Sequence, residues 1–135
     1  MRWFLRGLLI LVAILIGLGG ALYALSESRE VVVLHSRDPS GAMQATHLWV
    51  VDDAGAAWLR SGGPDRGWFV RVKQTPEIEL ERRGEKRAYT AVIVETPEAT
   101  ARVVALMREK YGWIDPFIER IEGGWQSIAV RLDPR

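Results

Sequence analysis

The stretch Trp58–Pro76, WLRSGGPDRGWFVRVKQTP, decides the fold and supplies the main candidate site. It begins as the end of a strand, passes through a Gly-Gly-Pro-Asp loop and continues as a short helix. Asp65 is placed to cap that helix, and the spacing of Trp68, Phe69 and Val72 gives it one apolar face. Thr75-Pro76 predicts its end, because the residue before a proline is disfavoured in helical conformation.

The same stretch is strongly basic in a chain that is almost neutral. Four cations and one acid give it a local charge of +3. Loop glycines, a helix N-terminus and clustered arginines are the groups that bind a phosphate or a similar anion. An ordinary solvated helix face is the alternative interpretation. The four cations are Arg60, Arg66, Arg71 and Lys73.

Composition excludes several classes of protein. The 135 residues contain no cysteine, which removes disulfides, thiolate metal sites and cysteine nucleophiles. Only His35 and His47 are available, and no HExxH, GxSxG or P-loop motif is present. After the N-terminal apolar segment, 16 lysines and arginines face 17 acids, a net charge of −1. No nucleic acid is therefore expected as a partner.

The N-terminal segment is a candidate membrane anchor. Gly7–Leu25 is 19 residues without a charge, and at ~1.5 Å per residue it can just cross a hydrocarbon core of ~30 Å. Arg2 and Arg6 precede it, which predicts a cytoplasmic N-terminus and a domain on the extracytoplasmic side of the cell membrane. A cleaved signal peptide is the alternative. We therefore divide the chain into an anchor, residues 1–28, and a domain, residues 29–135.

Hydrophobic patterns along the domain predict a mainly β fold with a few helices. Thr46–Asp52 is apolar on both alternating faces, which predicts a strand buried on both sides. The expected order is β-β-β-α-β-β-α-α-β, typical of a small closed or split barrel and unlike a Rossmann fold. The strands are expected at Glu30–Ser36, Thr46–Asp52, Ala56–Ser61, Glu77–Arg82, Lys86–Glu95 and Gln126–Leu132. The helices are expected to start at Arg66, Thr96 and Phe117, the last two ending at Gly112 and Ile121.

Two motifs resemble the deazaflavin-dependent nitroreductase family, part of the flavin-binding split β-barrel group that includes pyridoxamine phosphate oxidase-like proteins. Gly67-Trp68-Phe69 followed by Thr75-Pro76 resembles the family's Gly-Trp-Tyr-x-Asn-Leu-x-Ala-Asn-Pro segment. The loop Ser36–Gly41, SRDPSG, resembles its Gly-Arg-Lys-Ser-Gly loop. The resemblance covers roughly Val33 to Leu132.

This resemblance implies a deazaflavin or flavin mononucleotide (FMN) lying on the barrel, with its phosphate at the loop and helix of Trp58–Pro76. Such enzymes pass hydride from the reduced cofactor to quinone-like or nitroaromatic acceptors, and many are homodimers. Asp38 stands where the family has a basic residue and Arg71 where it has Asn, so Arg66, Arg71 and Lys73 are expected to hold the phosphate. The candidate cofactor-binding residues are Arg37, Thr46, Arg60, Ser61, Arg66, Trp68, Arg71 and Lys73.

Simpler interpretations remain open for several of these residues. Trp68 is expected to be a core residue rather than a ring-stacking one, while Thr46 can equally be an ordinary strand former and Arg37 a loop cation. His47 is expected to be a partly buried, satisfied histidine. For the whole domain, the alternative is a non-catalytic split barrel that binds a ligand or a membrane partner.

Overall fold

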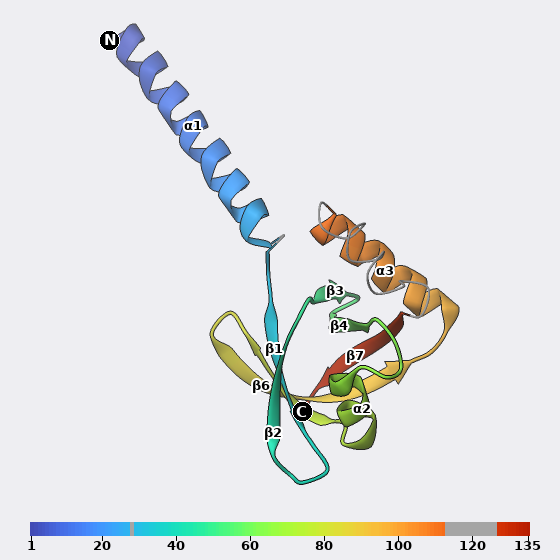
Figure 1. Cartoon of the computed structure of the whole chain (residues 1–135). Coiled ribbons are helices and arrows are strands. Elements are labelled where there is room, and N and C mark those ends of the chain that lie inside the picture. The colour runs from blue at the N-terminus through green and yellow to red at the C-terminus, as the bar shows by residue number, and fades with distance from the viewer. Residues whose placement is uncertain (28, 113–126) are drawn as a thin grey trace.

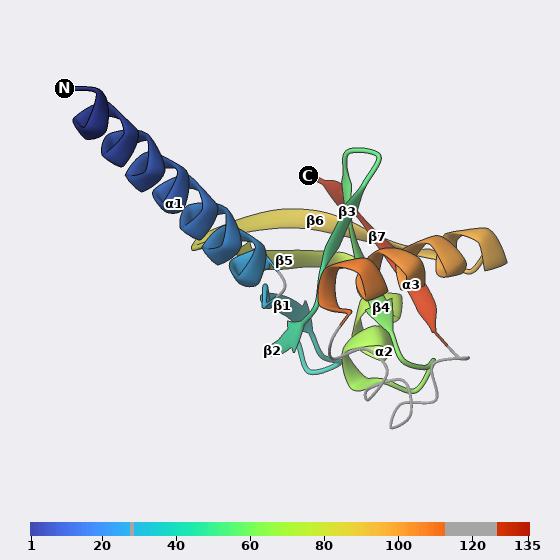
Figure 2. The same cartoon turned by 90° about the horizontal axis from the view of Figure 1, so that it is seen from above.

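The computed structural model describes residues 1–27, 29–112 and 127–135 (Figures 1 and 2). The helix expected at Phe117–Ile121 lies outside these residues. The described helices are α1 (Arg2–Glu27), α2 (Gly67–Gln74) and α3 (Pro97–Tyr111). The strands are β1 (Val32–Arg37), β2 (Met43–Leu48), β3 (Val51–Asp53), β4 (Ala56–Ser61), β5 (Glu77–Arg82), β6 (Glu85–Val94) and β7 (Ile128–Pro134).

The seven strands form one antiparallel sheet in the order β2-β1-β5-β6-β7-β4-β3. Its two edge strands, β2 and β3, follow one another in the chain and are separated only by Trp49 and Val50. Three Cα steps of about 3.8 Å therefore join one edge to the other. The sheet has to curl until its edges approach, which produces the split barrel and confirms the predicted fold class.

The prediction of one strand over Thr46–Asp52 is wrong. The chain leaves the edge of β1 at Leu48 and joins β4 at Val51, so the apolar run bridges two edges. Met43 is 44 % exposed and His47 is exposed, because β2 lies at the rim of the sheet. The run is apolar because Val50 and Val51 are buried at the crossing point.

Helix α2 packs its predicted apolar face against β1. Trp68, Phe69 and Val72 are all buried in the main core, and Thr75 follows the last helical residue as expected. Asp65 does not cap the helix: the N-cap is Arg66, with no side-chain cap hydrogen bond. Asp65 lies one residue too early, because the helix begins at Gly67.

Helix α3 covers a second, smaller core. Its start is as predicted: Pro97 opens the helix, and Thr96 Oγ1 accepts a hydrogen bond from the backbone N–H of Ala99 at 3.3 Å. This core consists of Val51, Val103, Met107, Tyr111 and Ala129.

Helix α1 projects away from the barrel (Figure 1). Its segment Arg2–Tyr23 has a mean hydropathy of 2.3, and none of it is buried against the rest of the protein. By length and composition the helix can cross a membrane, a property that an N-terminal signal sequence shares.

Candidate functional site

A cavity of about 390 Å³ lies between the start of β1, the end of β2, the loop before α2 and the middle of α3. Its size is in the range of small-molecule sites, about 300–1,000 Å³. Two arginines and one histidine are its charged or titratable side chains, and none of the described residues that line it is acidic. They are Val31, His47, Leu48, Trp49, Arg60, Gly62, Arg66, Trp68 and Met107.

Three of the residues predicted from the sequence meet in this cavity: Arg60, Arg66 and Trp68. Trp68 is only 7 % exposed and belongs to the main core, where its ring meets Phe69 edge-on at a centroid distance of 6.0 Å. It is therefore both a core residue and a cavity wall. His47 also lines the cavity and is exposed, so the expectation of a partly buried histidine is wrong.

Arg71 and Thr46 form a second candidate group: neither lines the cavity, but Thr46 precedes the lining residue His47 in the chain. Arg71 donates from Nε to Ser36 Oγ at 3.0 Å and from Nη2 to Thr46 Oγ1 at 3.1 Å. A Cβ atom at Gly67 would lie 3.3 Å from Nη1 of Arg71, so glycine leaves room for the guanidinium. Both partners are neutral, and Arg71 has no carboxylate partner in the part of the chain that the structure describes. Its charge remains available to an anionic ligand.

The remaining predicted residues do not line the cavity. Ser61 is fully buried, and its hydroxyl donates to Gly63 O at 2.6 Å, so it holds the loop before α2 in shape. Arg37 donates to Gly41 O at 3.2 Å within the turn between β1 and β2. Lys73 is exposed on α2.

Asp38 organises the turn between β1 and β2. Its carboxylate accepts hydrogen bonds from the Ser40 backbone at 2.9 Å, from Ala42 N at 3.1 Å and from Gln44 Nε2 at 3.0 Å. Hydrogen bonds from Ser40, then Gln44, lower the pKa of Asp38 to about 2. This turn therefore presents a satisfied anion where the family resemblance implies a cation.

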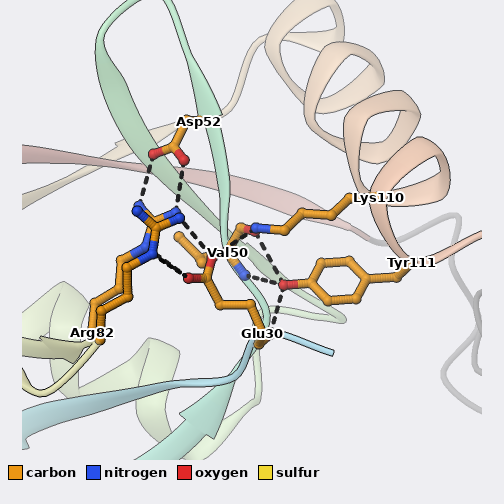
Figure 3. A network of polar contacts seen from close by, with 7 residues as sticks. Glu30, Val50, Asp52, Arg82, Lys110 and Tyr111 are labelled. Carbon is orange, nitrogen blue, oxygen red and sulfur yellow. Dashed lines mark hydrogen bonds and ion pairs between the residues drawn. The ribbon is translucent and has the colours of Figure 1, made fainter. Parts of the chain in front are cut away.

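A partly buried polar network was not foreseen from the sequence (Figure 3). Glu30 accepts hydrogen bonds from Arg82 Nη2 at 2.9 Å and from Lys110 Nζ at 2.8 Å. Arg82 also forms a two-point ion pair with Asp52, at 2.8 and 2.7 Å. The Tyr111 hydroxyl donates to Glu30 O at 2.7 Å. We call Glu30, Asp52, Arg82, Lys110 and Tyr111 the Glu30 clasp.

The clasp fixes three distant parts of the chain to one another. The Tyr111 hydroxyl also accepts from Val50 N at 3.3 Å, and the Tyr111 ring stacks on Trp49 at a centroid distance of 4.4 Å. Trp49 in turn lines the cavity. The clasp therefore joins the start of the domain, the crossing between the sheet edges and the end of α3.

We expect the clasp to make folding stability sensitive to acid. Burial alone would raise the pKa of Glu30, but hydrogen bonds from Arg82 and Lys110 outweigh it and lower this pKa below 4.5. The Arg82 hydrogen bond likewise lowers the pKa of Asp52 below 3.8. A lowered pKa means that the stabilisation is complete above the unfolded-state pKa and is lost as the pH falls through the folded-state pKa.

Urea unfolding of the full chain in detergent should therefore give a constant midpoint down to about pH 5 and a falling midpoint below it. The double variant Glu30→Gln/Asp52→Asn should be less stable at neutral pH and should lose less on acidification. If the urea midpoints of the wild type and the variant fell equally with pH, Glu30 and Asp52 would not be the source of the acid sensitivity.

Comparisons with known proteins identify the fold. No family model and no curated protein matches the chain. Among solved structures, the conserved hypothetical protein Rv2991 from Mycobacterium tuberculosis is 22 % identical with a TM-score of 0.60, over 85 % of this chain and 79 % of that one. HutZ, the haem storage protein from Vibrio cholerae, is 17 % identical with a TM-score of 0.62, over 86 % and 89 %.

An F420-H2 dependent reductase, FDR-A, is 20 % identical with a TM-score of 0.61, over 78 % of this chain and 95 % of that one. The alignments thus cover most of both chains, while the sequences have diverged far. The chain has the split-barrel fold, which it shares with F420-dependent reductases and with the haem storage protein HutZ.

Proposed function

We propose that this chain is a membrane-anchored oxidoreductase that binds a deazaflavin or FMN and passes hydride to a quinone-like or nitroaromatic acceptor. The observation that carries the proposal is the cavity itself, in which Arg60, Arg66 and Trp68 meet. Reductases dependent on F420, a deazaflavin, have the same fold.

The residues present fit such a cofactor. Arg66 and Arg71 would hold the phosphate; among the described residues the Arg71 guanidinium bonds only the hydroxyls of Ser36 and Thr46. Trp68 would pack against the ring system, and Trp49 and Met107 would exclude water from it. When bound, the cofactor supplies the hydride, so no protein side chain has to act as a nucleophile.

The anchor is part of this proposal. We propose that α1 remains in the cell membrane as a single span, with the N-terminus in the cytoplasm and the barrel on the other side. Arg2 and Arg6, which precede the apolar segment, support this orientation.

Direct binding tests the proposal. Full-length protein in detergent should change the absorbance and fluorescence of added FMN or F420, with a dissociation constant in the tens of micromolar or below. The complex with the reduced cofactor should then reduce a quinone. If neither cofactor binds at tens of micromolar, the oxidoreductase assignment fails.

A non-catalytic ligand-binding module, or one that binds a membrane partner, is the second candidate. The turn at Asp38 favours it, because an anion in that position opposes a phosphate. The haem storage protein HutZ also has this fold. Cofactor binding without any reduction of quinones or nitroaromatics would support this second function.

A further inference from the structure

The Glu30 clasp lies at the junction between the barrel and the anchor. Glu30 follows the last residue of α1, Glu27, by only three positions, and its side chain is 10 % exposed. Arg82 of β5 and Lys110 of α3 form ion pairs with its carboxylate. Tyr111 of α3 donates a hydrogen bond to its backbone oxygen. The barrel therefore binds the chain at Glu30, only three positions after the end of α1.

The cavity begins at the next residue. Val31 is 50 % exposed and lines the cavity together with Trp49, which stacks on the clasp residue Tyr111. From Tyr23 to Glu27 the helix rises ~6 Å, and four further residues reach at most ~14 Å. The part of the cavity wall at Val31 thus lies within about 20 Å of the end of the apolar span, on the side of the lipid headgroups.

The rim of the cavity has the chemistry of a membrane-facing surface. Val31 and Arg66 are exposed, and the described lining residues include no acid. Arginines and a tryptophan around an apolar opening suit the headgroup layer, where cations meet phosphates and aromatic rings lie between water and hydrocarbon. The turn between β1 and β2 lies on the opposite side of the barrel from α1 (Figure 1).

We propose that the Glu30 clasp holds the barrel in one orientation on its anchor, with the cavity rim docked on the lipid headgroups. The partner of this surface is the membrane that contains α1, and the cavity receives its ligand from the lipid phase. This inference rests on the proposed membrane anchor. It does not depend on which cofactor is bound.

Because the chain has no cysteine, single cysteines can report this orientation. His47→Cys places a fluorophore on the cavity rim, and Ala42→Cys places one in the exposed turn between β1 and β2. The full chain is reconstituted in phosphatidylcholine and phosphatidylglycerol vesicles that contain a lipid with a quencher on its headgroup. We expect the label at residue 47 to be quenched several-fold more strongly than the label at residue 42.

Two further variants test the clasp. Glu30→Gln removes the charge that Arg82 and Lys110 share, and the matched change Glu77→Gln alters an exposed glutamate at the start of β5. A flexible Gly-Ser segment inserted after Glu27 leaves every clasp contact in place but frees the barrel from the anchor. The quenching difference should disappear with Glu30→Gln and with the insertion, and should persist with Glu77→Gln.

Equal quenching at residues 42 and 47 in the otherwise unchanged chain would overturn the docked orientation. A difference that survives either Glu30→Gln or the insertion would overturn the clasp as its cause. If Glu30→Gln does not fold, the insertion decides. A chain that does not float with the vesicles refutes the anchor and this inference together, whereas cofactor binding with equal quenching refutes only this inference.

Discussion

Replacing Tyr111 with alanine should cost about 3–5 kcal/mol of folding free energy, the range for removing a large aromatic side chain from a core. Tyr111 is fully buried at the end of α3, where its ring stacks on Trp49 and its hydroxyl bonds Glu30 O and Val50 N. A small domain has only about 5–15 kcal/mol of stability in total. The variant should therefore unfold at a much lower urea concentration or fail to accumulate as folded protein.

The conservative change Tyr111→Phe distinguishes the contribution of the ring to stability from that of the hydroxyl. It keeps the stacking on Trp49 but leaves the carbonyl of Glu30 and the N–H of Val50 without that partner, at a cost of about 1–3 kcal/mol. The matched surface control is Glu109→Ala, on the exposed face of the same helix. If Tyr111→Ala were no more destabilising than Glu109→Ala, the clasp would not hold the barrel together.

The sequence predicts α2 and its contacts well because the information is local. Trp68, Phe69 and Val72 recur at helical spacing, and Thr75-Pro76 ends the helix within the same short stretch. Arg60 and Arg66 reach one cavity for a related reason: the loop between them is short and bounded by β4 and α2. Such features need no knowledge of the rest of the chain.

The sequence does not predict the crossing at Trp49 and Val50, because strand pairing is decided by distant partners. An apolar run such as Leu48–Val51 is compatible with a central strand, and only the pairing of β2 with β1 and of β3 with β4 rules that out. The sequence does not predict the clasp either, for the same reason. Glu30 and Tyr111 are 81 positions apart, and each looks like an ordinary element end in the sequence.

Ser61 and Arg37 show a second limit of sequence reasoning. Both stand beside glycine-containing loops, where a hydroxyl or a cation is well placed for a phosphate. In the structure each bonds a backbone carbonyl of its own loop, of Gly63 and of Gly41 respectively. A residue type shows what a side chain can bind, but its geometry decides whether a ligand or the loop takes that bond.

Arg71→Ala should weaken the binding of FMN or F420 by roughly tenfold to a hundredfold, equivalent to ~1.5–3 kcal/mol for a lost hydrogen bond to a charged group. The guanidinium of Arg71 is positioned by Ser36 and Thr46 and lacks a carboxylate partner among the described residues. It is therefore held in place without being neutralised. Fluorescence titration of each variant with both cofactors measures the effect.

Two controls decide whether the weaker cofactor binding of Arg71→Ala comes from the position of the guanidinium or only from its charge. Lys73→Ala removes the same charge from the same helix at an exposed position outside the cavity, and should change the dissociation constant little. Arg71→Lys keeps the charge but cannot reproduce the two hydrogen bonds of the planar guanidinium to Ser36 and Thr46. Thermal unfolding of each variant shows whether the loss of the buried Ser36 contact has weakened the fold.

The pattern across these variants separates the possible outcomes. If Arg71→Ala and Lys73→Ala weaken binding equally, the helix attracts the phosphate only through its overall charge. If Arg71→Lys binds as poorly as Arg71→Ala while both remain folded, the geometry fixed by Ser36 and Thr46 holds the phosphate. If neither change at residue 71 affects binding, the phosphate lies elsewhere, and Arg60 and Arg66 in the cavity wall are the cations left to hold it.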